Sequence, residues 1–335
     1  MEPSGSGAAA EWDARLGEWP AANLLQTYAW GEVQSRSGWT THRLLVPTAA
    51  GPLPVSAQVT KAGLPGFTRI YVPRGPCCPA SDQDTFRTVL AALVDLGRRC
   101  RALALEIEVS WRADEVPAGH PWLSWSPARA RQPTATVNID LQPEPELILS
   151  QFHSKARYNV GLAQRRGVVI NEQATVADLF RCITVTEGRH RIHLPGLRHL
   201  EALMELLGSS AWILAAEVED EVVAAILVAS FHGQATYLYG GSNGHHRDRM
   251  PNHLLQWSAM LRAREEGCHH YDLWGIPEND DPHHPWRGLA QFKLGFGGEQ
   301  VRYAGSRLLQ LRPSGATILA VSDAIRHQVR TRGRR

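Results

Sequence analysis

The sequence predicts an α/β protein made of two mixed-sheet units in tandem. The chain has 335 residues, which is long for a single core and suits two domains of about 150 residues each. Short runs rich in β-branched and aromatic residues alternate with amphipathic stretches, a pattern typical of strands mixed with helices. The order of these elements in the first half also recurs in the second half.

The first half is expected to begin with a flexible lead-in over residues 1–20 and a helix over 23–38. Three strands follow, each bounded by glycine or proline. Ser81 and Asp84 then form a capping box ahead of a long amphipathic helix. These elements are the strands 42–46, 55–60 and 68–72, the helix 85–100 and a fourth strand at 102–109.

The second half repeats this order: three strands, a helix and a fourth strand. The helix begins at a proline and stops at a glycine. Thirty-five residues separate Tyr71 from Glu106, and the same number separates Tyr237 from Asp272. A duplicated unit is the simplest explanation, and a chance likeness of two ordinary β–α–β stretches is the alternative. The elements are the strands 211–218, 221–230, 235–240 and 270–275 and the helix 251–267.

Between the halves, a hinge rich in proline and glutamate at 141–146 precedes a helical pair over 147–170. The chain ends in an amphipathic helix, 316–335, with a basic tail. The only basic patches are Lys155, Arg157, Arg165 and Arg166 in the pair and Arg330, Arg332, Arg334 and Arg335 in the tail. Because the net charge is only +2, a tRNA acceptor stem or an anionic membrane would have to bind at such a patch. Solvated charge on a surface helix is the alternative.

Composition argues against several classes of protein. The chain has no run of about 18 apolar residues and no basic region with an apolar core at its N-terminus, so we expect it to be neither membrane-spanning nor exported. Five cysteines, an odd number without a CxxC pair, suit a reducing cytoplasm. The fifteen histidines show no HExxH or comparable spacing, so no metal site is expected.

Each predicted half, with three strands, a helix and a fourth strand, resembles the N-acetyltransferase fold. Proteins of that fold bind acyl-coenzyme A through a Q/R-x-x-G-x-G/A loop, whose backbone N–H groups hold the pyrophosphate at a helix N-terminus. The equivalent turn here, RDRMPN at 247–252, has methionine and asparagine in place of glycines and a proline that lacks an N–H. The turn at 73–84 in the first half puts two acids where an anion would bind. Neither half is suited to coenzyme A.

Six short strings occur in order across nearly the whole chain: TYAWGEVQSRSGW, YVPRGP, KARYNVGLAQRRGV, YLYGGSNG, GCHHYDLWGI and GLAQFKLGFGGE. Together they resemble the FemABX family of tRNA-dependent aminoacyltransferases, which form peptidoglycan bridges. The resemblance implies two acetyltransferase-like domains. One contains residues 1–143 and 306–335, with the C-terminal helix returning to it, and the other contains residues 144–305. The stretch between Arg189 and the strand at 211 is too short for the coiled-coil arm of some members.

The segment WRGLAQFKLGFGGE, residues 286–299, places one lysine, Lys293, among aromatic residues and glycines. A lysine is almost never fully buried without a partner, so its position suggests an anionic partner. The resemblance implies that Lys293 contacts the tRNA end, where an ammonium would stabilise the charge on the ester carbonyl oxygen and on the departing ribose 3′-oxygen. Phe292 would stack on the terminal adenine. A lysine that snorkels from a helix end to water is the alternative.

On the acceptor side, the resemblance implies two cations that hold the diphosphate of the precursor. One falls on Arg189, which could instead complement the dipole of a helix C-terminus. The other falls on Gln34, in the predicted helix 23–38, which also contains Trp30, a further residue expected to bind substrate. Gln34 brings no charge, so a nucleotide-linked and a lipid-linked precursor both remain open. Tyr237 and Tyr239 are expected to line the acceptor groove, with a place in the core as the alternative.

Glu108 stands where members of the family carry an acid proposed as general base, which would take the proton of the attacking amine. A substrate carboxylate or the leaving oxygen could take it instead. The resemblance thus implies transfer of an amino acid from aminoacyl-tRNA to an amine in the stem peptide of a peptidoglycan precursor. No metal or soluble cofactor is expected, because the donor ester is already activated.

The expected partners are aminoacyl-tRNA and a precursor that is either UDP-MurNAc-peptide or lipid-linked. We expect a cytoplasmic monomer, with contact to the inner face of the membrane left open. Three alternatives remain: an acceptor amine on a small metabolite such as an antibiotic precursor, an acyl-coenzyme A donor, and a non-catalytic protein that binds tRNA or the precursor.

Overall fold

The computed structural model describes residues 7–62, 65–190, 195–278 and 286–312, apart from the side chains of 189 and 190. These residues form two compact units, each with its own sheet. The first contains the chain up to Gln132 and again from Tyr303, and the second runs from Pro133 to Arg302. Both boundaries lie earlier in the chain than expected. The first does so because β6 (Ala135–Asp140) pairs within the second sheet.

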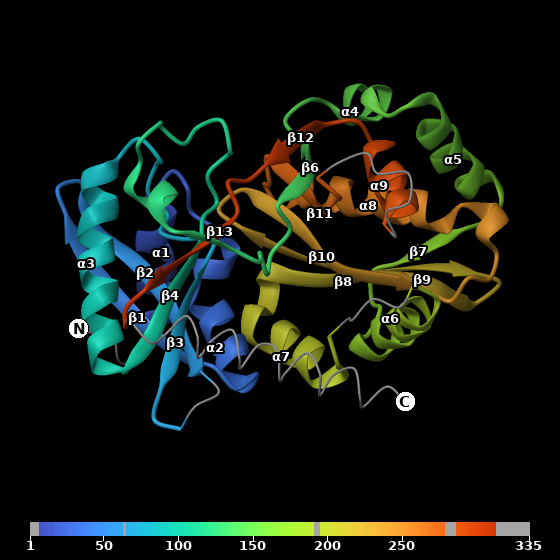
Figure 1. The fold of residues 1–335 in the computed structure, drawn as a ribbon. Helices are drawn as coiled ribbons and strands as arrows, with labels where there is room; N and C mark the ends of the chain where they lie inside the picture. Colours follow the sequence, from blue (N-terminus) through green and yellow to red (C-terminus); the bar gives the residue numbers. More distant parts are fainter. Residues whose placement is uncertain (1–6, 63–64, 191–194, 279–285, 313–335) are drawn as a thin grey trace. The chain divides into compact units, whose positions relative to one another are not determined.

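The first unit contains three helices, α1 (Ala8–Gly17), α2 (Tyr28–Arg36) and α3 (Gln83–Arg99), and two short 3-10 turns, η1 (Leu24–Gln26) and η2 (Pro121–Ser124). Its strands are β1 (Thr40–Thr48), β2 (Gly51–Lys61), β3 (Thr68–Pro73), β4 (Ala102–Glu108), β5 (Ser126–Ala128) and β13 (Ser306–Gln310). The strand order is β1-β2-β3-β4-β13-β5, and α3 crosses over from β3 to the parallel β4 (Figure 1).

The second unit contains the helices α4 (Pro145–Gln151), α5 (Ser154–Arg165), α6 (Val176–His190), α7 (Leu197–Leu207), α8 (Pro251–Glu265) and α9 (Arg287–Leu294), and the 3-10 turns η3 (Gly208–Ser210) and η4 (Arg247–Arg249). Besides β6, its strands are β7 (Val169–Asn171), β8 (Ala211–Val218), β9 (Glu221–Phe231), β10 (Gln234–Ser242), β11 (His270–Gly275) and β12 (Glu299–Arg302). In the order β12-β6-β11-β10-β9-β8-β7, the sheet carries α5, α8 and α9 on one face and α6 and α7 on the other (Figure 1).

The two units share one topology. The series β1-β2-β3-α3-β4 in the first corresponds to β8-β9-β10-α8-β11 in the second, and the last two strands of each series are parallel. Tyr71 lies opposite Glu106 in one parallel pair, and Thr236 lies opposite Asp272 in the other. The predicted α/β fold, with two tandem units of mixed sheet, is confirmed.

The central strand of the first sheet is buried along its whole length. Strand β4 reads ALALEIE, and all seven of its residues are buried, including Glu106 and Glu108. Helix α3 covers part of one face with an apolar stripe at helical spacing, which includes Phe86, Val89 and Leu93. A carboxylate in such a position must be hydrogen-bonded or neutralised, so the two acids mark a place where the sheet has polar partners.

Three local expectations were wrong. The predicted flexible lead-in contains α1, whose Trp12 and Leu16 are buried in the first unit. The predicted helix 23–38 divides at Thr27, whose hydroxyl accepts a hydrogen bond from the N–H of Trp30 and so caps α2. The N-cap of α3 is Asp82, not Ser81. The predicted C-terminal helix 316–335 and its basic tail lie outside the described residues.

Candidate active site

Lys293 is the one buried side chain of α9, with 4% of its surface exposed. Its Nζ donates a hydrogen bond to the carbonyl oxygen of Gly275 at 2.9 Å and lies 5.3 Å from the centre of the Tyr237 ring. Within the described ranges, no carboxylate forms an ion pair with it. Burial lowers the pKa of Lys293 to about 7, and the charge of Asp272 opposes this effect. The side chain therefore does not snorkel to water.

Phe292 is held beside this lysine by two perpendicular rings. Its ring centre lies 5.1 Å from that of His253 in α8 and 5.0 Å from that of Phe296. Burial, and next the charge of Lys155, lower the pKa of His253 to about 4, so its ring is neutral at pH 7. The neutral Nε2 can accept a hydrogen bond from Asn159 of α5 at 3.2 Å. These contacts connect α5, α8 and α9 and fix the orientation of the half-buried Phe292.

The glycines that follow Lys293 allow close backbone contacts. Gly297 and Gly298 have φ angles of 73° and 80°, in the left-handed region that favours glycine. A Cβ on Gly297 would lie 2.6 Å from the carbonyl oxygen of Gln151, and one on Gly298 would lie 2.5 Å from that of Asn138. The turn after α9 therefore lies directly against the end of α4 and against β6, which anchors α9 on the sheet.

The two tyrosines of β10 lie on opposite faces of the sheet. A bulge at Leu238 makes Tyr237 and Tyr239 pair with consecutive residues of β9, so their side chains point to opposite sides. Tyr237 is the ring beside Lys293, whereas Tyr239 contacts His199 of α7 at 6.1 Å between ring centres. Burial raises the pKa of each tyrosine to about 12, so both are neutral at pH 7. Only Tyr237 contributes to the lysine site.

Glu108, in the first unit, is completely buried at the end of β4. Its carboxylate accepts hydrogen bonds from the hydroxyl of Tyr71 at 2.6 Å and from the backbone N–H groups of Arg131 and Gln132 at 3.2 and 3.0 Å. Burial raises the pKa of Glu108, while these hydrogen bonds and the charge of Arg74 lower it. Both carboxylate oxygens are engaged, and they hold the segment around Arg131 against the sheet.

The neighbouring acid, Glu106, is neutralised by an arginine that the sequence did not single out. Arg131 forms an ion pair with Glu106 at 3.1 Å, and its guanidinium lies 5.6 Å from the Trp39 ring and 5.0 Å from the Tyr71 ring. The other oxygen of Glu106 accepts a hydrogen bond from Ser306 of β13 at 3.2 Å. The acids of β4 thus belong to one hydrogen-bonded cluster, which joins strands that are distant in sequence.

The residues expected to bind the acceptor have different surroundings. Trp30, with 5% of its surface exposed, belongs to the core of the first unit. Gln34 is half-buried on the following turn of α2. Arg189 lies in α6, and its side chain is outside the described residues. Trp30 therefore packs in the interior, and Gln34 alone of the α2 pair reaches the surface.

Two of the four cations in the predicted basic patch have partners within the protein. Arg157 donates hydrogen bonds to the carbonyl oxygens of Ser150 and Phe152, at the end of α4. Arg166 donates to the backbone carbonyl and the carboxylate of Asp248, each at 2.8 Å. These two arginines join α5 to its neighbours.

The other two cations lie on an exposed face of α5. Lys155, Tyr158 and Arg165, which we call the α5 strip, are spaced by three and seven residues and so share one side of the helix. Tyr158 is 60% exposed, and the guanidinium of Arg165 lies 5.7 Å from its ring centre. Lys155 also acts electrostatically on His253, the residue that packs against Phe292. The strip thus begins near α9.

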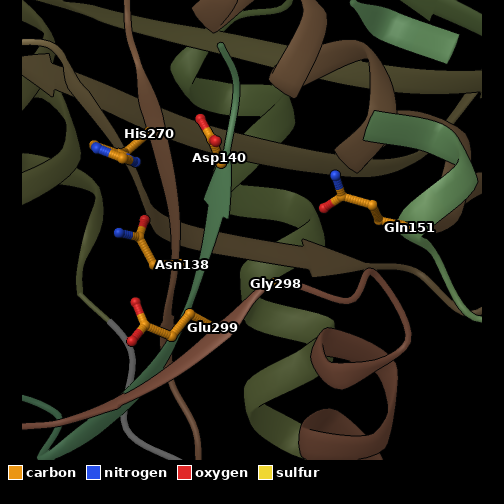
Figure 2. Close-up of a pocket in the computed structure, with 6 residues that line it drawn as sticks. All are labelled: Asn138, Asp140, Gln151, His270, Gly298 and Glu299. Atoms are coloured by element: carbon orange, nitrogen blue, oxygen red, sulfur yellow. The ribbon is translucent and has the colours of Figure 1, made fainter. Parts of the chain in front are cut away.

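A polar hollow of about 510 Å³ opens on the second unit, but it is not the lysine site (Figure 2). It is lined by Asn138, Asp140, Gln151, His270, Gly298 and Glu299, none of which was expected in the site. Figure 2 shows Asp140 on β6 and Glu299 on the adjacent β12. Two carboxylates disfavour a phosphate-bearing ligand at this place.

Sequence reasoning did not identify His253 and Gly275, which support Phe292 and Lys293. Gly275 has a signal in the sequence, since it lies in the DLWGI string that precedes the lysine string. His253 has none, because it reaches Phe292 only through the packing of α8 on α9.

In the part of the chain that the structure describes, no helix is long and apolar enough to cross a membrane, and no three His, Cys, Asp or Glu side chains are grouped to hold a metal ion.

Comparisons with known proteins agree with this architecture. The model of the FemAB family matches residues 8–120 and 214–320, well over half of the chain. The lipid II:glycine glycyltransferase of Staphylococcus saprophyticus is 22% identical over 363 aligned residues, which cover 85% of this chain and 87% of that protein. The protein of the same name from Staphylococcus aureus is 21% identical over 370 residues, covering 86% and 88%.

Two solved structures have a similar fold. The crystal structure of FemX matches with a TM-score of 0.78 and 18% identity, over 90% of this chain and 96% of that one. The structure of L-PGS from Bacillus licheniformis matches with a TM-score of 0.56 and 14% identity, over 96% and 97%.

Proposed function

The chain belongs to the FemAB family, and we propose that it transfers an amino acid from aminoacyl-tRNA to an amine in the stem peptide of a peptidoglycan precursor. The relatives named as lipid II:glycine glycyltransferases support a transferase that builds peptidoglycan bridges. The observation on which the proposal depends is Lys293, a buried ammonium that, among the described residues, has a single hydrogen-bond acceptor and no counter-ion. It can donate to an oxygen that becomes negative during the reaction.

The proposed reaction is aminolysis of an ester. The lone pair of the acceptor amine forms a C–N bond with the ester carbonyl carbon, and the C–O bond to the ribose 3′-oxygen then breaks. One proton leaves the amine and one arrives on the ribose oxygen, so no other reactant is consumed. Negative charge develops first on the carbonyl oxygen and then on the ribose oxygen, and a fixed cation beside them lowers the barrier.

Lys293 suits both stages of this reaction. An ammonium has three N–H donors, and Gly275 occupies one of them. Because burial lowers the pKa of Lys293 to about 7, the side chain can also give a proton to the leaving oxygen and recover one from the amine near neutral pH. Glu108 is less suited to be the base, because Tyr71 and two backbone N–H groups already use its oxygens.

The donor end is proposed to approach along α5 and α9. Phe292 offers a ring of fixed orientation on which a terminal base can stack, and stacking contributes roughly 1–3 kcal/mol per base. The α5 strip adds an exposed aromatic ring between two cations, a combination suited to an unpaired RNA strand. Coenzyme A is disfavoured, because Met250 and Pro251 occupy the start of α8, where that cofactor needs glycines and free N–H groups.

For the acceptor, we propose a lipid-linked precursor. The lipid II activity named for the two staphylococcal proteins supports this choice. The protein would then work at a membrane surface. An amine on a small metabolite is the competing acceptor.

A transfer assay tests the proposal. The purified protein is incubated with tRNA carrying radiolabelled amino acids and with lipid-linked precursor, nucleotide-linked precursor or neither, and label in the precursor is measured. We expect label in the lipid-linked precursor with charged tRNA, and none when acetyl-coenzyme A is the donor. Absence of transfer to either precursor with every charged tRNA, or transfer from acetyl-coenzyme A, would contradict the proposal.

A further inference from the structure

Strand β11 ends in an unusual turn beside Lys293. Trp274 has a φ of 60°, in the left-handed region that large side chains rarely adopt. The register between β11 and β6 shifts between Asp272 and Gly275, so the strand bulges at this point. A residue persists in such a conformation only where its surroundings hold it. The carbonyl group of Gly275, which follows Trp274, is the acceptor for the Lys293 ammonium.

The side chain that holds this turn is Asp272, which is 2% exposed. Its Oδ1 accepts a hydrogen bond from the backbone N–H of Trp274 at 2.7 Å. The Thr136 hydroxyl on β6 contacts the same oxygen and lies 3.0 Å from the carbonyl oxygen of Trp274. Gln234 on β10 approaches the other oxygen at 3.4 Å. The carboxylate thus connects the turn to both neighbouring strands.

We propose that Asp272 is a positioning residue for Lys293: it fixes the turn that presents the Gly275 carbonyl to the ammonium. This inference rests on the proposed function of Lys293. Asp272 is the neighbour whose charge favours the protonated lysine. It acts through another residue.

Three titratable groups on the elements around Lys293 are neutral at pH 7. Burial raises the pKa of Tyr237 on β10 to about 12 and that of Tyr271 on β11 further, and it lowers the pKa of His253 on α8 to about 4. Lys155 on α5 acts on His253, and Arg287 at the start of α9 is exposed. None of these groups therefore carries a negative charge like that of Asp272.

The small number of lysines in the chain allows the protonation of Lys293 to be measured directly. Of 35 basic residues only three are lysines, Lys61, Lys155 and Lys293. An arginine remains charged at any working pH, whereas a buried lysine can exchange a proton. Protein labelled with 13C at the lysine ε carbon should give three signals, of which the exposed Lys61 and Lys155 are internal references.

The first test is a titration of these signals by NMR. We expect the Lys293 signal to titrate near pH 7, and Asp272→Asn to lower its midpoint by about one pH unit, because one opposite charge is removed. The asparagine side chain can still accept the Trp274 N–H, so this variant isolates the charge. The control is Asp140→Asn on β6, the same change at an exposed carboxylate, which should leave the midpoint in place. An unchanged midpoint in Asp272→Asn would overturn the charge role.

The second test is the pH dependence of transfer. If the protonated lysine is the active form, Asp272→Asn should approach the wild-type rate at low pH and be roughly tenfold slower above both midpoints, since the protonated fraction falls tenfold per unit. An equal loss at every pH would show a merely structural effect. Asp272→Ala, which also removes the acceptor of the turn, should lose activity at every pH.

A further variant keeps the proposal testable if Asp272→Asn fails to fold. Thr136→Val removes one hydrogen bond to the carboxylate and retains its charge, so transfer should fall severalfold while the Lys293 midpoint stays in place. Unchanged transfer would overturn the positioning role. The titration needs no substrate, so it tests the link between Asp272 and Lys293 even if the proposed function fails, a failure that Lys293→Met would reveal.

Discussion

At the scale of single residues, Lys293 destabilises the fold that holds it. Its ammonium is almost completely removed from water and, among the described residues, is compensated by one carbonyl oxygen, the face of one aromatic ring and the charge of Asp272, which forms no ion pair with it. Burying a charge without a counter-ion is unfavourable, and its pKa of about 7 expresses that penalty. A residue that weakens the fold and has no structural partner of matching strength is typical of a functional site.

Replacing Lys293 with methionine should stabilise the protein. The pKa of the folded lysine lies below that of the unfolded chain, so the unfolded chain binds more protons between about pH 7 and pH 10, and wild-type stability rises with pH across this window. The variant should gain a few kcal/mol at pH 6, on the order of the pKa difference, and less at pH 9.5. Denaturant unfolding at both values measures this gain. Lys155→Met, at an exposed lysine, is the control, and a variant less stable than wild type at pH 6 would refute the penalty.

The neighbours of Lys293 in the sequence indicated it as a candidate site residue, but they did not indicate its environment. A lysine among glycines and aromatics already suggested an anionic partner. The bulge that sets its hydrogen bond depends on a left-handed tryptophan at 274, which opposes the local preference of that residue. The position of Tyr237 likewise depends on the extra residue in β10, and no two-residue alternation indicates such a bulge.

At the scale of elements, helix α5 shows how charge that is contiguous in sequence separates in space. The sequence grouped four cations, but Arg157 and Arg166 hold neighbouring segments together. Lys155 and Arg165 remain exposed, with Tyr158 between them. Helix periodicity alone places this trio on one face, but hydrogen bonds to α4 and to Asp248 could not be read from the sequence.

The α5 strip should contribute to tRNA binding. Removing Lys155 and Arg165 together should weaken binding and reduce the slope of log affinity against log salt by about one for each phosphate that is no longer neutralised. Tyr158→Ala should weaken binding by roughly 1–3 kcal/mol and leave the slope nearly unchanged, because stacking is not ionic. Titrations with tRNA between about 50 and 200 mM salt measure both effects. Arg181→Ala on α6 is a matched control, and equal affinity of all variants would remove the strip from the donor site.

Helix α1 is one of the elements that the sequence interpretation missed, and it lies where a flexible lead-in was predicted. Its buried residues, Ala8, Trp12 and Leu16, follow a four-residue spacing, but it follows a stretch rich in glycine and serine. We expect Trp12→Ala to lower the free energy of unfolding by about 3–5 kcal/mol, as for other buried tryptophans. The variant also removes the indole N–H that donates a hydrogen bond to the carbonyl oxygen of Gln26. Trp286→Ala, at a 41% exposed tryptophan, should change stability little, and similar losses in both variants would argue against a docked α1.

At the scale of the whole molecule, each sheet is completed by a strand from another part of the chain. β13 returns to pair with β4 of the first unit, and β6 pairs with β11 of the second. The repeated period of 35 residues allowed the two units to be predicted, because local pattern determines each β–β–β–α–β series. The two long-range pairings have no such period, which explains why the predicted boundary fell after β6.

The central claim is that Lys293 acts on the ester of a charged tRNA. The most direct test is the single-turnover rate of amino acid transfer from charged tRNA to the lipid-linked precursor, measured for wild type and Lys293→Met at saturating concentrations of both substrates. The account predicts a rate roughly 10²–10³-fold lower in the variant, as for loss of one group that stabilises an oxyanion, with tRNA affinity little changed. Transfer by Lys293→Met at the wild-type rate would contradict it.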